Sequence, residues 1–173
     1  VVKEAETMMY KRKLLESQSA RSAMLSTLQA SLLEKDIETN EHTLRLVETT
    51  NRLGEMLQLS STETVDLNLL ARLHDIGYVV VDERILKKAG KLTDEEMAEV
   101  KKHPEAGFRI AESSRIAANI ATNILHHHEW WDGTGYPHGL KGTEIPLLSR
   151  VISIADAYDA MTHDRPYRKA MSE

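Results

Sequence analysis

The residues best able to do chemistry are histidines and carboxylates that lie close together along the chain. His74 is followed directly by Asp75, and Glu38 precedes His42 by four residues. A spacing of four places the second pair on one helix face, about one turn apart. Asp156 lies in the otherwise apolar stretch "RVISIADAYDAM", where a bare carboxylate is costly to bury. These groups are candidate ligands of a metal ion.

The chain contains eight histidines and no cysteine, so a metal site in it would use imidazoles and carboxylates. That donor set suits Fe, Mn or Zn rather than a metal that prefers sulfur. Three of the histidines are consecutive, in "LHHHEW". One histidine alone is usually a surface residue or a hydrogen-bonded core residue. Several candidates near the ends or inner faces of predicted helices, however, match the way helix bundles build metal sites.

The elements that must position these residues are predicted to be helices. Residues 1–35 contain no Gly or Pro and predict one long helix, either a solvated lead-in or a coiled-coil connector from an upstream sensor. Ser60 with Glu63 has the pattern of a capping box, opening a helix that Gly77 can end. The stretch "YVVVD", residues 78–82, is strand-like but too short and isolated to build a sheet.

The second half of the chain has the same helical character. Thr93 with Glu96 has a second capping-box pattern, which opens a helix that continues past His103. A further helix is expected over residues 113–128, and Pro146 suits the first residue of a last long helix. A Gly-rich loop, "WDGTGYPHGLKG", separates these two helices. The predicted fold class is all-α.

Length, charge and composition exclude several classes of protein. The 173 residues, 41% of them hydrophobic, suit a single domain with its own core. A net charge of -5 offers no broad basic surface to duplex nucleic acid, and the absence of cysteine leaves no disulfides. No apolar run approaches the roughly 18 residues of a membrane span, and the N-terminus lacks the apolar core of a signal peptide. A cytoplasmic domain that forms part of a longer protein is expected.

Three stretches of the sequence resemble one known family. They are "ETNEHTLRL", "HDIG" and the long run "HHHEWWDGTGYPHGLKGTEIPLLSRVISIADAYDAMTHDRPY". In order, spacing and residue type they resemble the HD-GYP family, bacterial cyclic di-GMP phosphodiesterases within the HD superfamily of metal-dependent phosphohydrolases. The resemblance covers residues 36–169. It implies an HD-type helical bundle over residues 36–173, truncated at its C-terminal end, with the long N-terminal helix over 1–35 as a signalling connector.

The resemblance implies a centre of two or three divalent metal ions, with Fe or Mn favoured. His74 and Asp75 match the HD signature as the catalytic pair, and Asp75 would be the carboxylate that bridges two metals. Glu38 and His42 match residues that supply a third metal site in some members. The full implied ligand set is Glu38, His42, His74, Asp75, His103, His127, His128 and Asp156.

Three histidines have no counterpart among the ligands that the resemblance implies. His126 falls on a variable position of the family. His138 and His163 match no family ligand and are expected to be surface residues.

The reaction that the resemblance implies is hydrolysis of cyclic di-GMP to pGpG, and in some members to GMP. Two metals bridged by a carboxylate and a water lower that water's pKa, so a metal-bridging hydroxide can attack near neutral pH. Arg165 and Arg168 would face substrate phosphate, unless they are plain surface arginines. Tyr136, in the GYP loop, would border the substrate, and the loop would contact a partner GGDEF domain. The N-terminal helix would follow an upstream sensor domain and could form a homodimer.

The chain departs from the family pattern at two positions. Tyr78 stands where the family usually has a lysine beside the scissile phosphate, and Trp130 stands where it usually has an arginine. Loss of one charge-assisted contact, worth roughly 1.5–3 kcal/mol, would slow an enzyme by about one to two orders of magnitude. Three hypotheses follow: a weak cyclic di-GMP phosphodiesterase, a metal-containing receptor in which Tyr78 stacks on guanine, or an HD phosphohydrolase for another cyclic dinucleotide such as cyclic GMP-AMP.

Overall fold

The fold is that of a computed structural model, which describes residues 39–114, 117–163 and 170–171. Before residue 39 it describes only Met9, Ala23, Ser26, Thr27, Ala30 and Leu32. Most of the predicted helix over residues 1–35 therefore lies outside the described residues. Three predicted site residues, Glu38, Arg165 and Arg168, lie outside them as well.

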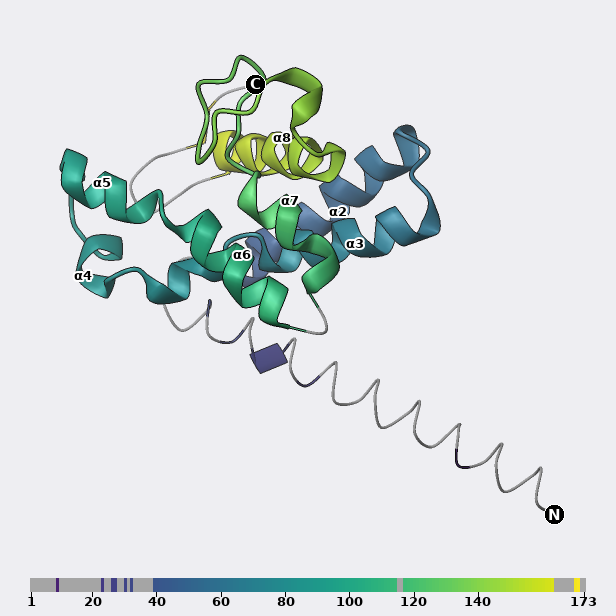
Figure 1. Ribbon diagram of the computed structural model, residues 1–173, viewed down its shortest axis with the longest axis horizontal. Coiled ribbons are helices and arrows are strands. Elements are labelled where there is room, and N and C mark those ends of the chain that lie inside the picture. Colours follow the sequence, from purple (N-terminus) through teal and green to yellow (C-terminus); the bar gives the residue numbers. More distant parts are fainter. Residues whose placement is uncertain are drawn as a thin grey trace.

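Helices make up the regular structure of the described residues, which confirms the predicted all-α class (Figure 1). None of these helices is long and apolar enough to cross a membrane. In chain order the elements are α2 (Asn40–Met56), α3 (Ser61–Leu73), η1 (Ile76–Val80), α4 (Glu83–Leu86), α5 (Asp94–Val100), α6 (His103–Ser113), η2 (Ala118–Ile120), α7 (Ala121–Leu125), η3 (Gly142–Glu144) and α8 (Leu147–Thr162), where η marks a 3-10 helix.

The core lies where the longer helices meet. α2 packs against α3 and α8, while α6 packs against η1 and α7 (Figure 1). Leu46 of α2, Leu70 of α3, Ile124 of α7 and Ile152 of α8 are fully buried in one cluster. Burial of each such side chain contributes roughly 1.5–3 kcal/mol. This shared core sets the relative positions of the helices that carry the candidate ligands.

Both predicted capping boxes are present, and each begins a helix. The Ser60 hydroxyl accepts the N–H of Glu63 at the start of α3, and the Glu63 carboxylate accepts the N–H of Ser60. Thr93 and Glu96 make the same reciprocal pair at the start of α5. Each box satisfies backbone donors that the first turn of a helix leaves without an intrahelical partner.

The predicted continuous helix through His103 is wrong. α5 ends at Val100, and a separate helix, α6, begins at His103. Pro104 is the physical reason, because proline has no N–H to donate and clashes with the preceding turn, so it belongs in the first turn of a helix. The break places the His103 side chain at the start of α6, where it is fully buried.

Three other local predictions need correction. Residues 113–128 do not form one helix, because α6 ends at Ser113 and α7 covers only Ala121–Leu125. The strand-like "YVVVD" lies mainly in η1, since an isolated strand has no neighbour with which to pair its backbone. Pro146 is the N-cap of α8 rather than its first residue. The consecutive histidines therefore lie in the turn after α7, where the backbone can aim them in different directions.

Gly77 allows η1 to lie directly against the start of α6. A Cβ atom at this position would overlap the backbone carbonyl of His103, and it would also lie 2.7 Å from the backbone nitrogen of Gly107. Only glycine permits that approach without a backbone shift. The sequence predicts Gly77 to end the preceding helix, but α3 already ends at Leu73. The role of Gly77 is to bring the residues after α3 to the residues that open α6.

Candidate metal centre

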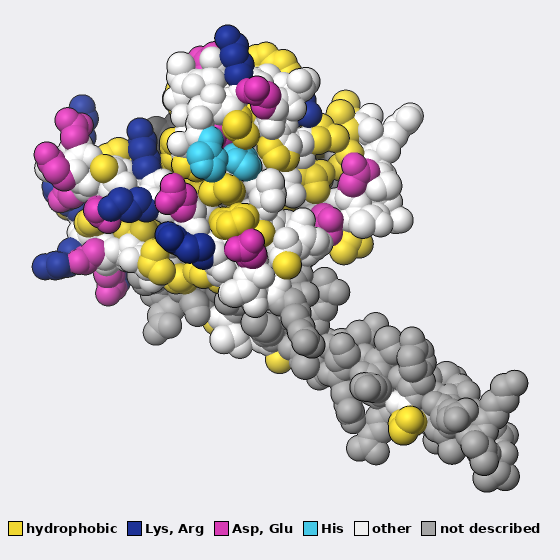
Figure 2. Space-filling model, viewed as in Figure 1, with side chains coloured by type: hydrophobic (Ala, Val, Ile, Leu, Met, Phe, Trp, Pro, Cys, Tyr) yellow, Lys and Arg dark blue, Asp and Glu magenta, His cyan; other side chains and the backbone are white. Residues whose placement is uncertain are grey.

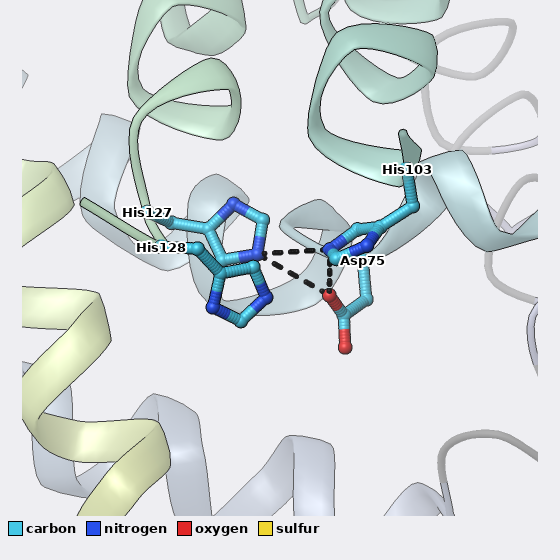
Figure 3. A group of neighbouring side chains, drawn as sticks. All are labelled: Asp75, His103, His127 and His128. Carbon is cyan, nitrogen blue, oxygen red and sulfur yellow. Dashed lines mark hydrogen bonds and ion pairs between the residues drawn. The ribbon is translucent and has the colours of Figure 1, made fainter. Parts of the chain in front are cut away.

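Asp75 and three histidines form the first cluster of candidate ligands. Asp75 follows the end of α3, His103 opens α6, and His127 and His128 follow α7 (Figure 3). Asp75 Oδ1 lies 3.3 Å from His103 Nε2 and 3.4 Å from His127 Nε2. All four residues offer a ligand atom within 4.8 Å of the others. The turns at three helix ends therefore converge on one point.

Backbone carbonyls fix the orientation of two of these imidazoles. His103 Nδ1–H donates to the carbonyl of Val100 at 2.8 Å, and His127 Nδ1–H donates to the carbonyl of Ile124 at 2.6 Å. Each bond leaves the Nε2 atom to carry the lone pair. The two Nε2 atoms face each other 3.3 Å apart. Outer hydrogen bonds of this kind set the tautomer and the ring orientation of metal-ligating histidines.

A second cluster consists of His42, His74 and Asp156. His42 lies in the first turn of α2, where the Thr39 hydroxyl caps the helix by accepting the N–H of His42. His42 Nε2 lies 3.7 Å from Asp156 Oδ1 on α8. His74 Nε2 lies 3.5 Å from Asp75 Oδ2, the oxygen that does not face the first cluster. Asp75 thus has one oxygen toward each cluster, as a bridging carboxylate requires.

Asp159 and Arg45 support the second cluster from outside. His42 Nδ1–H donates to Asp159 Oδ2 at 2.6 Å, while Arg45 Nε and Nη2 donate to the two oxygens of Asp159 at 2.6 and 3.0 Å. Burial raises the pKa of Asp159, but the hydrogen bonds from Arg45 and His42 outweigh it and hold that pKa to about 2. The carboxylate is therefore ionised and keeps the Nε2 atom of His42 turned toward Asp156.

Neither supporting residue is among the site residues predicted from the sequence. Asp159 lies three residues after Asp156 in "ADAYDA", a spacing that places both on one face of α8. Arg45 lies three residues after His42 on α2 in the same way. These spacings were the available signal. No local pattern shows that α2 and α8 pack together, and that contact is what brings Arg45 to Asp159.

The electrostatics of the centre favour the protonation states that bind cations. Burial lowers the pKa of His74, and it lowers the pKa of His128 to about 2 with help from the neighbouring His127. Burial alone would raise the pKa of Asp75, but His74, His103 and His127 together hold it well below its usual value. At neutral pH His74 and His128 are neutral and Asp75 is ionised, which is the state that a metal ion requires.

The residues present fit a divalent metal centre. Asp75 Oδ1 is buried and makes no hydrogen bond within the described part of the chain, although the Nε2 atoms of His103 and His127 lie close to it. A buried carboxylate oxygen without a hydrogen bond is costly unless a cation balances it. Imidazoles and carboxylates without thiolates are suitable ligands for Fe, Mn or Zn.

Two tyrosines border the first cluster. The Tyr78 ring stacks on His103, with 4.1 Å between ring centroids and 11° between ring planes. The Tyr136 ring stacks on His128 at 4.9 Å and 25°. Gly135 permits this second contact, because a Cβ atom there would overlap the backbone of the turn that carries His128. Burial raises the pKa of Tyr136, so its hydroxyl stays protonated at neutral pH.

The structure brings together seven of the eight predicted ligands, and the eighth, Glu38, lies outside the described residues. The seven are His42, His74, Asp75, His103, His127, His128 and Asp156. Trp130, which stands where the resemblance leads us to expect an arginine, is largely exposed. His138 is exposed, as expected, whereas the half-buried His163 contacts Asp159 at 3.1 Å.

The chain is similar to several known proteins. A family model described as the HD domain matches residues 9–173. A cyclic di-GMP phosphodiesterase of Thermotoga maritima is 42% identical over 139 residues, which are 78% of this chain and 37% of that protein. A 3'3'-cGAMP-specific phosphodiesterase of Vibrio cholerae is 38% identical over 136 residues, which are 76% of this chain and 26% of that protein.

A solved structure shows the same helical fold. The crystal structure of a cyclic GMP-AMP specific phosphodiesterase of V. cholerae aligns with a TM-score of 0.64 at 21% identity, covering 83% of this chain and 41% of that chain. The chain thus spans less than half the length of each of these relatives. From the family match and the identity to curated relatives, the chain belongs to the HD domain family, and its resemblance to the HD-GYP proteins is confirmed.

Proposed function

We propose that this chain is the catalytic part of a metal-dependent phosphodiesterase that hydrolyses cyclic di-GMP to pGpG, with GMP as a further product. The observation that carries the proposal is the position of Asp75, whose two oxygens face two separate clusters of imidazole and carboxylate groups. The name of the T. maritima relative supports the choice of substrate.

The two clusters would each hold a divalent ion, with Fe or Mn favoured. Asp75, His103, His127 and His128 would hold one, and His42, His74 and Asp156 the other, with Asp75 between them. Glu38 would join His42 if a third ion binds. When bound, such ions offset negative charge on phosphate and supply a hydroxide near neutral pH.

The chain's own residues prepare and orient this centre. The carbonyls of Val100 and Ile124 hold protons on the Nδ1 atoms of His103 and His127, which leaves both Nε2 atoms as ligands. Asp159 does the same for His42. Such outer contacts hold the ligands in a binding-ready arrangement, so less ordering remains when a metal or substrate arrives.

Substrate contacts are proposed for four residues. The protonated hydroxyl of Tyr136 could donate a hydrogen bond to a phosphate oxygen beside His128. Tyr78 supports His103 with one face, and an aromatic ring at that position can also stack on a guanine base. Arg165 and Arg168 would bind phosphate through their forked donors.

The wider setting is part of the same proposal. The domain would belong to a longer cytoplasmic protein in which residues 1–35 pass a signal from an upstream sensor and form a homodimer. The GYP loop would meet a GGDEF-domain partner. The exposure of Trp130 and Trp131 beside this loop, 58% and 62%, suits a protein contact.

The test is anaerobic incubation of the chain with cyclic di-GMP and Fe(II) or Mn(II), followed by chromatography of products and metal analysis of the same sample. Metal-dependent formation of pGpG is expected. Asp75→Asn should lose both turnover and bound metal, whereas Asp94→Asn, a matched change at an exposed helix N-terminus, should lose neither. Full metal occupancy with bound but intact cyclic di-GMP would instead identify a receptor.

A second candidate substrate is 3'3'-cyclic GMP-AMP. The name of the V. cholerae relative, which is 38% identical to this chain, favours it. Parallel rates on cyclic di-GMP and cyclic GMP-AMP at equal concentration would separate the two. A ratio of kcat/KM above about ten for the mixed dinucleotide, a difference of about 1.4 kcal/mol in transition-state binding, would assign the chain to that substrate.

A further inference from the structure

A third cluster of ligating side chains lies at the surface, separate from the centre described above. It consists of His126, Glu129 and His138, which offer ligand atoms within 4.8 Å of one another. His126 and Glu129 follow α7, and His138 lies in the loop that leads to η3. Figure 2 shows histidine side chains gathered at the surface where this loop meets α7. None of the three residues belongs to the two clusters around Asp75.

The two imidazoles present their nitrogens to each other in a geometry that suits a shared ion. His126 Nδ1–H donates to the carbonyl of Thr122 at 2.9 Å, which leaves its Nε2 atom with the lone pair. That Nε2 atom lies 3.2 Å from His138 Nδ1. Two nitrogens bound to one tetrahedral ion at 2.0–2.1 Å are separated by about 3.3 Å. The corresponding nitrogens of His103 and His127 in the centre are 3.3 Å apart.

Glu129 is a carboxylate already held in place beside this pair. Its side chain is buried and accepts the backbone N–H groups of His138 at 2.7 Å and Leu140 at 3.0 Å. These bonds hold the loop so that the His138 ring lies against His126. Each carboxylate oxygen keeps a further lone pair for a ligand. No Lys or Arg forms an ion pair with Glu129 among the described residues, so a nearby cation would balance a buried charge.

We propose that His126, Glu129 and His138 bind one late transition-metal ion of the class that includes Zn(II), Ni(II) and Cu(II). Two imidazoles with one carboxylate suit these ions better than they suit Mg(II) or Ca(II), which prefer ligands that are all oxygen. Three protein ligands leave a fourth position for water or for a donor from another molecule. The bound ion ties the loop to the end of α7. It would join His138, two residues after Tyr136, to His126, two residues before His128.

The competing account is a plain hydrogen bond, in which His138 Nδ1–H donates to His126 Nε2. It explains the 3.2 Å distance equally well but binds no ion.

Metal counting separates the two accounts. Chain saturated with Zn(II) and passed through a desalting column should carry one equivalent more than the His138→Ala variant. His138 is exposed, so its removal leaves the fold intact. Lys141→Ala, a change at an exposed position in the same loop, should keep the full metal content.

A second readout uses the only two tryptophans of the chain, Trp130 and Trp131, which directly follow Glu129. In an Asp75→Asn background, which disables the centre, Ni(II) should quench tryptophan fluorescence saturably, and His138→Ala should abolish this quenching. His126→Ala should do the same. Equal Zn(II) content in the wild type and His138→Ala, or equal quenching with and without His138, would overturn the proposal. The comparison does not depend on cyclic di-GMP hydrolysis, so failure of one proposal leaves the other standing.

Discussion

At the level of single residues, the candidate metal centre depends on side chains that are not themselves candidate ligands. Tyr78 supports His103 by stacking, and Asp159 supports His42 by accepting its Nδ1–H. Neither is a candidate ligand, yet each fixes the orientation of one. Tyr78 therefore has a structural role that was not predicted from the sequence, in addition to the substrate contact proposed for it.

Removing the Tyr78 ring should weaken metal binding. Tyr78→Ala takes away the stack on His103 and frees that imidazole to rotate, so we expect metal affinity to fall by about ten-fold. Tyr78→Phe keeps the ring and should stay within about three-fold of the wild type. Competition with a chelator of known affinity measures both variants. Equal affinities for the alanine and phenylalanine variants would mean that the stack has no influence on the site.

Asp159→Asn should weaken metal binding at the cluster that contains His42. The amide is neutral and cannot give Arg45 and His42 the paired acceptors that the carboxylate gives. Changes to such outer partners typically cost about 10- to 100-fold in metal affinity. Glu48→Gln, at an exposed position of α2, is the matched control. Metal retention during dialysis against chelator is the measurement, and unchanged retention in Asp159→Asn would contradict the assigned role.

At the scale of elements, the centre is built where helices end. Asp75 follows α3, His103 opens α6, and His127 and His128 follow α7. A helix end leaves backbone carbonyls without intrahelical partners, and two of these carbonyls accept the Nδ1–H of His103 and His127. Helix ends therefore supply both candidate ligands and the carbonyls that orient them, from the end of α5 for His103 and from the end of α7 for His127. η1 must lie close to α6 for this convergence, and Gly77 makes that approach sterically possible.

Gly77→Ala should destabilise the domain and disrupt the centre. The added methyl group would overlap the carbonyl of His103, so η1 and α6 must separate. Overpacking of this kind costs typically about 1–3 kcal/mol. Gly54→Ala in α2 is the control, because its Cβ would meet only side-chain atoms, of Leu59 at 3.4 Å and of Leu67 at 3.6 Å, and alanine favours a helix. Urea unfolding with metal analysis measures both. A Gly77→Ala variant as stable and as metal-rich as the wild type would refute the packing argument.

At the scale of the whole molecule, folding concentrates buried titratable groups at one place. Two histidines whose pKa values are lowered by burial, His74 and His128, lie beside Asp75, whose pKa is held low by the surrounding imidazoles. Asp159 adds a second carboxyl group with a lowered pKa. In the metal-free protein all four groups bind protons less readily when folded than when unfolded. The stability of the domain is therefore tied to pH.

The stability of the metal-free protein should fall steadily with decreasing pH. His74 and His128 contribute stability above their unfolded pKa of about 6.5, and this contribution is lost as the pH falls below that value. Asp75 and Asp159 add a further loss below about pH 4. Each group contributes at most about 1.4 kcal/mol per pH unit. Thermal unfolding at pH 8, 6, 5 and 4 measures the trend, and a constant midpoint between pH 8 and 5 would contradict it.

Sequence alone was enough to predict the helical class, both capping boxes and the types of the candidate ligands. These features depend on local rules, such as the reciprocal hydrogen bonds of Ser60 with Glu63, or on motifs within a short stretch, such as His74-Asp75. Local rules failed at His103 and over residues 113–128, where helical propensity predicted longer helices than the fold contains.

Which of these groups come into contact depends on how the helices pack. The approach of α2 to α8 brings Asp159 to His42 across 117 positions of sequence, and the turn after α7 brings His126 to His138. Sequence spacing reports which residues share a face of one helix, but not which faces pack together. Packing depends on burial of the whole apolar core, to which every helix contributes. For that reason motifs could supply the candidate ligands, while their supporting residues and the third cluster could not be predicted.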